Sequence, residues 1–127
     1  MSPSILIIED SNTQAQQVAA YLSGYDIDVL IASDGPQGLR LIKAHKPSLI
    51  VLDINLPTMN GYQVCRRLKR DPETAGIPVI MLSSRAESES KIQGISAGAI
   101  EYIPKDQFAI DNLLAVLGEL DFIDERR

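Results

Sequence analysis

Carboxylates directly follow two runs of aliphatic residues in the sequence. Ile5–Ile8 leads into Glu9 and Asp10, and Leu49–Leu52 leads into Asp53. Clustered carboxylates repel one another and raise each other's pKa unless a cation compensates them. Their oxygens suit Mg²⁺, which typically keeps several waters and leaves positions for phosphate oxygens. If the two runs are neighbouring strands, the sequence predicts a divalent-cation site where they end.

Polar side chains also follow two later apolar runs. Val79–Leu82 is followed by Ser83, and Ile100–Ile103 by Pro104 and Lys105. A hydroxyl and an ammonium facing a carboxylate-bound metal form a cradle for a phosphoryl group. Taken singly, each residue could be a helix cap, a turn residue or a solvated charge, but the combination favours one site. The sequence has no glycine-rich phosphate loop, so a bound nucleotide is not indicated.

Five short apolar runs alternate with amphipathic segments along the chain. The runs are mostly continuous, as expected for strands buried on both faces of a parallel sheet. They are Ile5–Ile8, Ile27–Ala32, Leu49–Leu52, Val79–Leu82 and Ile100–Ile103. The alternation predicts right-handed βαβ units in a three-layer α/β sandwich. Ligands of such sheets bind at the carboxyl ends of the strands, where the strand order reverses. In the flavodoxin-like, doubly wound order 2-1-3-4-5, the first and third strands flank that point.

Helix start and stop signals lie between the runs. We expect the first helix to run from Ser11 or Asn12 to Gly24 and the second to begin after a cap at Asp34. The third is expected from near Gly61 to Asp71-Pro72, the fourth over roughly Glu87 to Ala97, and the fifth over roughly Gln107 to Leu120. In the last helix, Phe108, Leu113, Leu114 and Leu117 are expected to face inward. His45 is expected at the end of the second helix.

Length and composition indicate one domain, residues 1–127, with a real core. The net charge of -5 argues against nucleic-acid binding. No apolar run approaches the ~20 residues that span a membrane, and the N-terminus lacks the basic region of a signal peptide. The single cysteine, Cys65, suits a reducing cytoplasm and is expected to be a small core residue. The run Arg66, Arg67, Lys69 and Arg70 is expected to be a solvated helix face.

Four motifs, in this order and spacing, carry a resemblance to a known family. They are IIED, LDINLPTMNG, VIMLSS and EYIPK. With them the chain resembles a response-regulator receiver domain of the CheY-like kind over essentially its whole length. The resemblance implies a stand-alone receiver with the fold described above.

The resemblance also implies roles for individual residues. Asp53 would be the phospho-accepting nucleophile, and Ser83 and Lys105 would bind the phosphoryl oxygens. Mg²⁺, or Mn²⁺ in its place, would be held by Glu9, Asp10, Asp53 and the backbone carbonyl of Asn55. Ser83 and Tyr102 would form the switch, while Asn55 and Arg85 would tune dephosphorylation.

The function implied is a phosphorylation-activated switch of a two-component system. A sensor histidine kinase or a histidine phosphotransfer protein would phosphorylate it, and the face of helix 4, strand 5 and helix 5 would signal to a downstream protein. It would be a cytoplasmic signalling protein, a monomer or weak homodimer, with self-catalysed phosphorylation and dephosphorylation rather than an enzyme. Two alternatives remain: a haloacid-dehalogenase-type phosphatase, whose D-x-D-x-[TV] signature IIEDSN does not match, and a phosphorylation-independent interaction module.

One departure from the family concerns the residue after Lys105. Family members commonly have a proline there with a cis bond, whereas this chain has Asp106. The Lys105-Asp106 bond is then either cis at a cost in energy, or trans with a different entry into the last helix. The Asp106 carboxylate could cap that helix or pair with Lys105.

Overall fold

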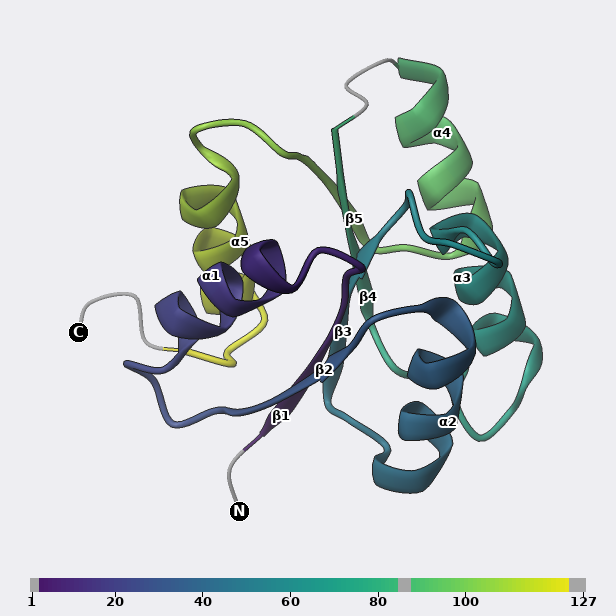
Figure 1. The fold of residues 1–127 in the computed structure, drawn as a ribbon, viewed down its shortest axis with the longest axis horizontal. Helices are drawn as coiled ribbons and strands as arrows, with labels where there is room; N and C mark the ends of the chain where they lie inside the picture. Colours follow the sequence, from purple (N-terminus) through teal and green to yellow (C-terminus); the bar gives the residue numbers. More distant parts are fainter. Residues whose placement is uncertain (1–2, 85–87, 124–127) are drawn as a thin grey trace.

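The computed structural model describes residues 3–84 and 88–123. Strands and helices alternate throughout this part of the chain (Figure 1). The strands are β1 (Ser4–Ile8), β2 (Asp28–Ala32), β3 (Leu49–Asp53), β4 (Val79–Ser83) and β5 (Glu101–Pro104). The helices are α1 (Asn12–Leu22), α2 (Gly35–His45), α3 (Gly61–Arg70), α4 (Ser88–Ala97) and α5 (Ala109–Glu119).

The strands form one parallel sheet in the order β2-β1-β3-β4-β5, which confirms the predicted topology. The register pairs Ile8 with Leu52, Asp53 with Leu82 and Ser83 with Pro104. The residues that follow β1 and β5 therefore lie at the same edge of the sheet as Asp53.

Helices cover both faces of the sheet, with α1 and α5 on one side and α2, α3 and α4 on the other (Figure 1). Because successive side chains of a strand point to opposite faces of the sheet, each strand contributes residues to the cores on both faces. On β1, Leu6 and Ile8 join the core under α2, α3 and α4, whereas Ile5 and Ile7 join the core under α1 and α5. The apolar runs of the sequence are continuous because both faces of the sheet are buried under helices.

Two helix starts follow the predicted caps. The Ser11 hydroxyl accepts a hydrogen bond from Gln14 N at 3.2 Å, and the Asp34 carboxylate accepts one from Gln37 N at 2.8 Å. Helix α1 ends at Leu22, before Gly24, and the Ser23 hydroxyl donates to the carbonyl of Ala20 at 2.7 Å. This side-chain bond closes the last turn without a glycine.

The expectation that Phe108 faces inward is wrong. The Asp106 carboxylate accepts a hydrogen bond from Phe108 N at 2.8 Å, which forms a separate turn before α5 begins at Ala109. The Phe108 side chain is consequently 54% exposed, while Leu113 and Leu117 are buried as predicted. The predicted start of α4 at Glu87 lies outside the described residues.

Lys69 departs from the expected solvated face of α3. Its ammonium donates hydrogen bonds to the carbonyls of Ala75 and Ile77, at 3.0 and 2.8 Å, and so ties the connection between α3 and β4 to the helix. Arg66, Arg67 and Arg70 are exposed as predicted. Cys65 is fully buried in the core, and α2 ends at His45.

None of the helices in the described ranges, 3–84 and 88–123, has the length and apolar character needed to cross a membrane.

Candidate functional site

An acidic cluster lies at the carboxyl ends of β1 and β3. Glu9 and Asp53 are buried, with 6% and 4% exposure, whereas Asp10 is exposed. One carboxylate oxygen from each of the three residues lies within 4.8 Å of the others. The sheet register produces this arrangement, since Ile8 and Leu52 are partners and the next residue on each chain carries a carboxylate.

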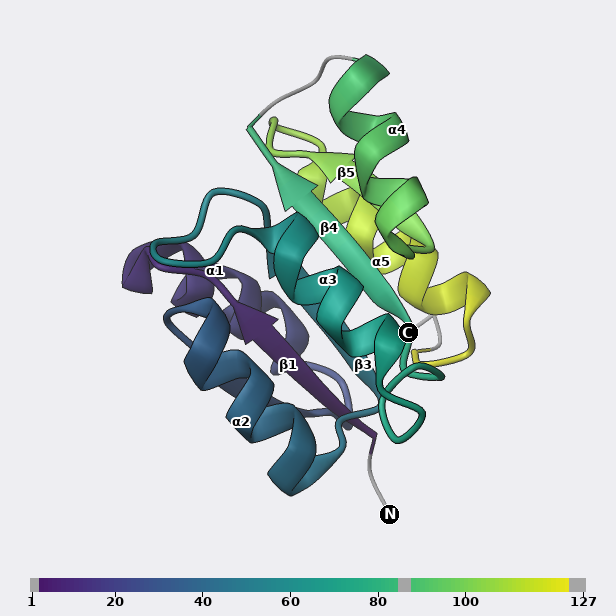
Figure 2. The same cartoon turned by 90° about the vertical axis from the view of Figure 1, so that its right-hand side faces the viewer.

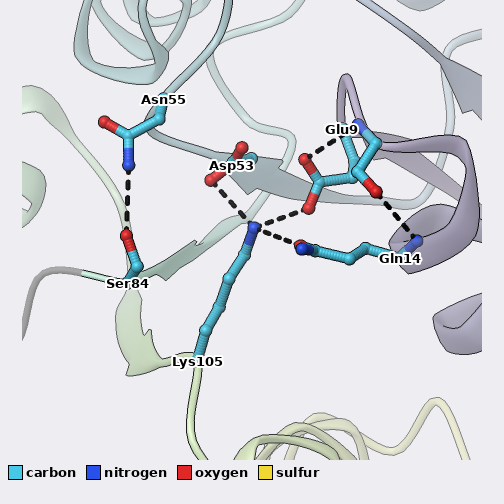
Figure 3. A network of polar contacts seen from close by, with 7 residues as sticks. Glu9, Gln14, Asp53, Asn55, Ser84 and Lys105 are labelled. Carbon is cyan, nitrogen blue, oxygen red and sulfur yellow. Dashed lines mark hydrogen bonds and ion pairs between the residues drawn. The ribbon is translucent and has the colours of Figure 1, made fainter.

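Lys105 reaches into the acidic cluster from the end of β5 (Figure 3). Its ammonium lies 2.5 Å from Glu9 Oε1 and 3.2 Å from Asp53 Oδ1. It also donates a hydrogen bond to Gln14 Oε1 at 2.8 Å. Asp53 Oδ1 is buried, has no hydrogen-bond partner that meets the usual geometry within the described ranges, and forms an ion pair with Lys105.

The surroundings shift the pKa values of two of these groups in the same direction. Burial raises the pKa of Glu9, its Asp53 neighbour adds to the rise, and Lys105 partly opposes it. Burial alone would lower the pKa of Lys105, but Glu9 and Asp53 outweigh it and the pKa is raised. Lys105 therefore stays positively charged beside Glu9, whose ionised form burial disfavours.

The start of α3 packs closely against the backbone of Asp53 and Ile54. A Cβ on Gly61 would lie 2.6 Å from the carbonyl oxygen of Asp53 and 2.8 Å from Cα of Ile54, so only glycine fits there. Gly61 N also donates to the carbonyl of Ile54 at 2.9 Å. Asn60 and Gln63 fix this helix start through a reciprocal capping box. Together these contacts set the position of the backbone that carries Asp53.

The other sequence-predicted residues surround the cluster. Ser83 ends β4 and is fully buried, and its carbonyl accepts a hydrogen bond from Lys105 N at 2.6 Å. The Asn55 side chain donates to Ser84 Oγ at 3.3 Å, across the loops that follow β3 and β4 (Figure 3). Arg85 lies outside the described residues.

Tyr102 is buried on β5, with 6% exposure. A Cβ on Gly94 of α4 would lie 2.9 Å from Tyr102 Cδ2 and 2.9 Å from Met81 Sδ. The tyrosine ring thus packs closely against the middle of α4, where a glycine leaves room for it.

The Lys105-Asp106 bond is trans, as are the other peptide bonds in residues 3–84 and 88–123. The Asp106 carboxylate caps the turn before α5, while Lys105 pairs with Glu9 and Asp53 instead. The bond is thus the trans alternative, and the carboxylate neither caps α5, which has no side-chain cap, nor pairs with Lys105.

Sequence reasoning missed two polar contacts of the site. Gln14 binds Lys105, and Ser84 binds Asn55. Gln14 lies in the first turn of α1, directly beyond β1, so its place in the chain was a usable signal. Ser84 follows Ser83 at the end of β4, where the same reasoning applies.

The donor set fits a divalent cation. The three carboxylates bring hard oxygen ligands close together. The buried Asp53 Oδ1 can still coordinate a cation, because it has an ion pair with Lys105 but no hydrogen-bond partner among the described residues.

Comparison with known proteins decides the family. The sequence model of the family described as the response regulator receiver domain matches residues 5–117 of this chain. The chain belongs to this family. It is a phosphorylation-activated switch of the two-component signalling type, and its acidic pocket of Glu9, Asp10 and Asp53 fits the Mg²⁺ site of receiver domains.

Individual relatives agree with the family assignment. The chain is 42% identical over 113 residues to the DNA-binding dual master transcriptional regulator RpaA of Synechocystis sp., a match that covers 89% of this chain and 46% of RpaA. It is 37% identical over 101 residues to protein PilH of Pseudomonas aeruginosa, covering 80% of this chain and 84% of PilH. The receiver domain of Francisella response regulator 1452 superimposes with a TM-score of 0.85 at 30% identity, covering 94% of this chain and 96% of that domain. This receiver chain therefore spans less than half of RpaA but most of PilH.

Proposed function

We propose that Asp53 is the residue that accepts the phosphoryl group. The observation that carries this proposal is the buried Asp53 carboxylate, placed beside two further carboxylates and 3.2 Å from the Lys105 ammonium. A nucleophilic carboxylate in phosphoryl transfer needs nearby positive charge for the phosphoryl oxygens, and Lys105 supplies it.

The transfer forms a bond between one Asp53 oxygen and phosphorus, while the bond from phosphorus to a histidine nitrogen of the donor breaks. The donor is a sensor histidine kinase or a histidine phosphotransfer protein. Lys105 neutralises charge on the phosphoryl oxygens, and the Ser83 hydroxyl donates to one of them. A Mg²⁺ or Mn²⁺ ion held by Glu9, Asp10, Asp53 and the Asn55 carbonyl supplies further positive charge when bound.

The chain catalyses its own phosphorylation and dephosphorylation, and it has no separate substrate to turn over. Attack of water on the phosphoryl group returns Asp53 to its carboxylate form. Asn55 and Arg85 follow Asp53 and Ser83 by two residues each, and the resemblance to receiver domains implies that these positions tune that step.

The signal leaves through α4, β5 and α5. When Ser83 moves toward the phosphoryl group, Tyr102 moves into the space it leaves and changes its packing against α4. Ile92 and Ile95 of α4 are 64% and 44% exposed and offer apolar surface to a downstream protein. Residues 1–127 act as a single receiver domain in the cytoplasm, as a monomer or weak homodimer.

Intact mass after incubation with Mg²⁺ and acetyl phosphate tests this function. The wild-type chain is expected to gain one phosphoryl group, and to gain none when EDTA is present. Asp53→Asn is expected to gain none under any condition. Equal labelling of wild type and Asp53→Asn would exclude Asp53 as the acceptor.

A further inference from the structure

Helices α2 and α3 carry much of the positive charge of this acidic chain. The chain has 12 lysines and arginines against 17 aspartates and glutamates. Within α2 and α3, however, there is no acidic residue, and their exposed cations are Arg40, Lys43, Arg66, Arg67 and Arg70. The two helices lie side by side on one face of the sheet (Figure 2). The charge is therefore concentrated on one surface instead of being spread over the molecule.

This surface is hollowed between the helices. A groove of about 480 Å³ is lined by Arg40 and Lys43 of α2, by Arg67 and Arg70 of α3, and by the apolar side chains of Leu39 and Leu68. A second hollow of about 420 Å³ adjoins it, because Arg67 and Arg70 line both. The second hollow extends to Thr58 and Met59, in the loop that follows β3.

One carboxylate lies inside the groove. Asp71 forms an ion pair with Lys43 at 3.3 Å, and it is 27% exposed. Its backbone bond from Glu73 N and its contact with Lys43 hold its pKa below the usual value, so it remains charged. Asp71 offsets one cation, and the arginines of the groove remain available to an anionic partner.

We propose that this groove is a docking surface for an acidic polypeptide segment that carries one aliphatic side chain. Carboxylates of the segment pair with Arg40, Arg67 and Arg70, and arginine is suited to bind carboxylates in a bidentate manner. The aliphatic side chain packs on Leu39 and Leu68 between them. No aromatic side chain lines either hollow within the described part of the chain, which leaves nucleic-acid bases nothing to stack on.

The docking surface is separate from the phosphorylation site. Neither hollow includes Glu9, Asp10, Asp53 or Lys105 among its lining residues. The proposal therefore stands independently of the role of Asp53, and its test can use the unphosphorylated chain.

Fluorescence anisotropy with labelled peptides of about ten residues, long enough when extended to cover α3, tests the proposal. The probes are an acidic peptide with a central leucine, the same peptide with serine in place of leucine, and its lysine-rich counterpart. A single-stranded oligonucleotide of equal length serves as the competing polyanion. Measurements at low ionic strength keep the surface charges unscreened.

The acidic leucine peptide is expected to bind the wild-type chain more tightly than the three other probes. Arg67→Glu and, independently, Arg40→Glu are expected to weaken it by about fivefold or more, since each reverses a charge at the contact. Lys91→Glu, an equal charge change at an exposed site on α4, is expected to leave the affinity within about twofold. Circular dichroism of each variant checks that it is folded.

Several results would overturn the proposal. They are absence of binding by the acidic leucine peptide, equal weakening by Lys91→Glu, equal binding of the serine peptide, or tighter binding of the oligonucleotide at the same arginines.

Discussion

Lys105 and the three carboxylates around it define the electrostatics of the site. With Glu9, Asp10 and Asp53 ionised, one ammonium leaves two negative charges uncompensated. The charge of a divalent cation would balance this excess. A bound cation would also relieve the repulsion that contributes to the raised pKa of Glu9.

Mg²⁺ is therefore expected to stabilise the folded chain. At a concentration ten times its Kd, the gain in unfolding free energy is about 1.4 kcal/mol. Thermal unfolding with and without MgCl₂ measures it. Asp10→Asn is expected to lose most of the gain, because it removes the exposed ligand without disturbing the buried pair of Glu9 and Asp53.

The control for this measurement is Asp26→Asn, an equal charge change at an exposed position before β2, at the opposite end of the strands. It should keep the full gain. A loss of similar size in both variants would mean that Mg²⁺ acts only through general charge screening.

Cys65 is a titrating group that lies in the hydrophobic core, away from the acidic cluster. Burial is the main cause that raises its thiol pKa above the ordinary value of 9.0, and its neighbours Lys69 and Arg66 only partly oppose this. The folded chain therefore disfavours the thiolate, while the unfolded chain ionises normally. As pH rises through about 9, Cys65 thus favours the unfolded state.

Thiol labelling with Ellman's reagent at pH 8 checks this description. The folded chain is expected to react at least about 100-fold more slowly than the chain in denaturant, since only the rarely unfolded molecules expose Cys65. Rapid labelling of the folded chain would contradict its placement in the core.

At the scale of elements, the packing of α3 against the end of β3 positions the carboxylate of Asp53, the proposed phosphoryl acceptor. Gly61 is the point of closest approach, and the atoms its Cβ would meet belong to the backbone of Asp53 and Ile54. Backbone atoms cannot rotate away as a flexible side chain can, so any larger residue must displace the helix or the strand end.

Gly61→Ala is expected to lower the unfolding free energy by about 1–3 kcal/mol, as overpacking does in tight cores. It should also weaken the Mg²⁺-induced stabilisation, because Asp53 is displaced. Gly76→Ala is the matched control: a Cβ there has no neighbour within 4 Å, so stability should change little. Chemical denaturation of both variants, with and without MgCl₂, makes the comparison. Equal effects of the two substitutions would show that the close approach at Gly61 is unimportant.

The sequence predicted the elements well where local signals were strong. Within the described residues, the aliphatic runs identified the five strands to within one residue at every end, and Asp34 was recognised as a cap. Helix ends were less predictable. The Ser23 hydroxyl closes the last turn of α1 in place of the expected Gly24, and the Asp106 carboxylate forms a turn that delays the start of α5. Lys69 could not be placed from sequence, since the helical pattern does not show that the connection after α3 folds back onto it.

At the scale of the whole molecule, the candidate site was more predictable than the basic groove. The rule that parallel strands end at one edge was enough to gather Glu9, Asp53 and Lys105. The groove depends on which side chains of the neighbouring helices α2 and α3 line the space between them, and the strand order alone does not give this. The contacts Asn55–Ser84 and Gln14–Lys105 were within reach of the same rule, because Ser84 directly follows β4 and Gln14 lies in the first turn of the helix after β1.

The molecule as a whole thus separates charge between two regions. The acidic cluster lies at the carboxyl edge of the sheet, and the exposed arginines lie along α2 and α3. Long-range attraction between such regions and charged partners depends on ionic strength. The two surfaces can therefore be probed separately by variants that change one without touching the other.

Chemical localisation of the phosphoryl group tests most directly whether Asp53 is the acceptor. After incubation with Mg²⁺ and acetyl phosphate, borohydride reduction converts an aspartyl phosphate to homoserine, and peptide mass spectrometry identifies its position. Homoserine is expected at position 53 and at no other aspartate. Homoserine at Asp10, or a stable phosphate on Ser83, would contradict the assignment of Asp53 as the acceptor.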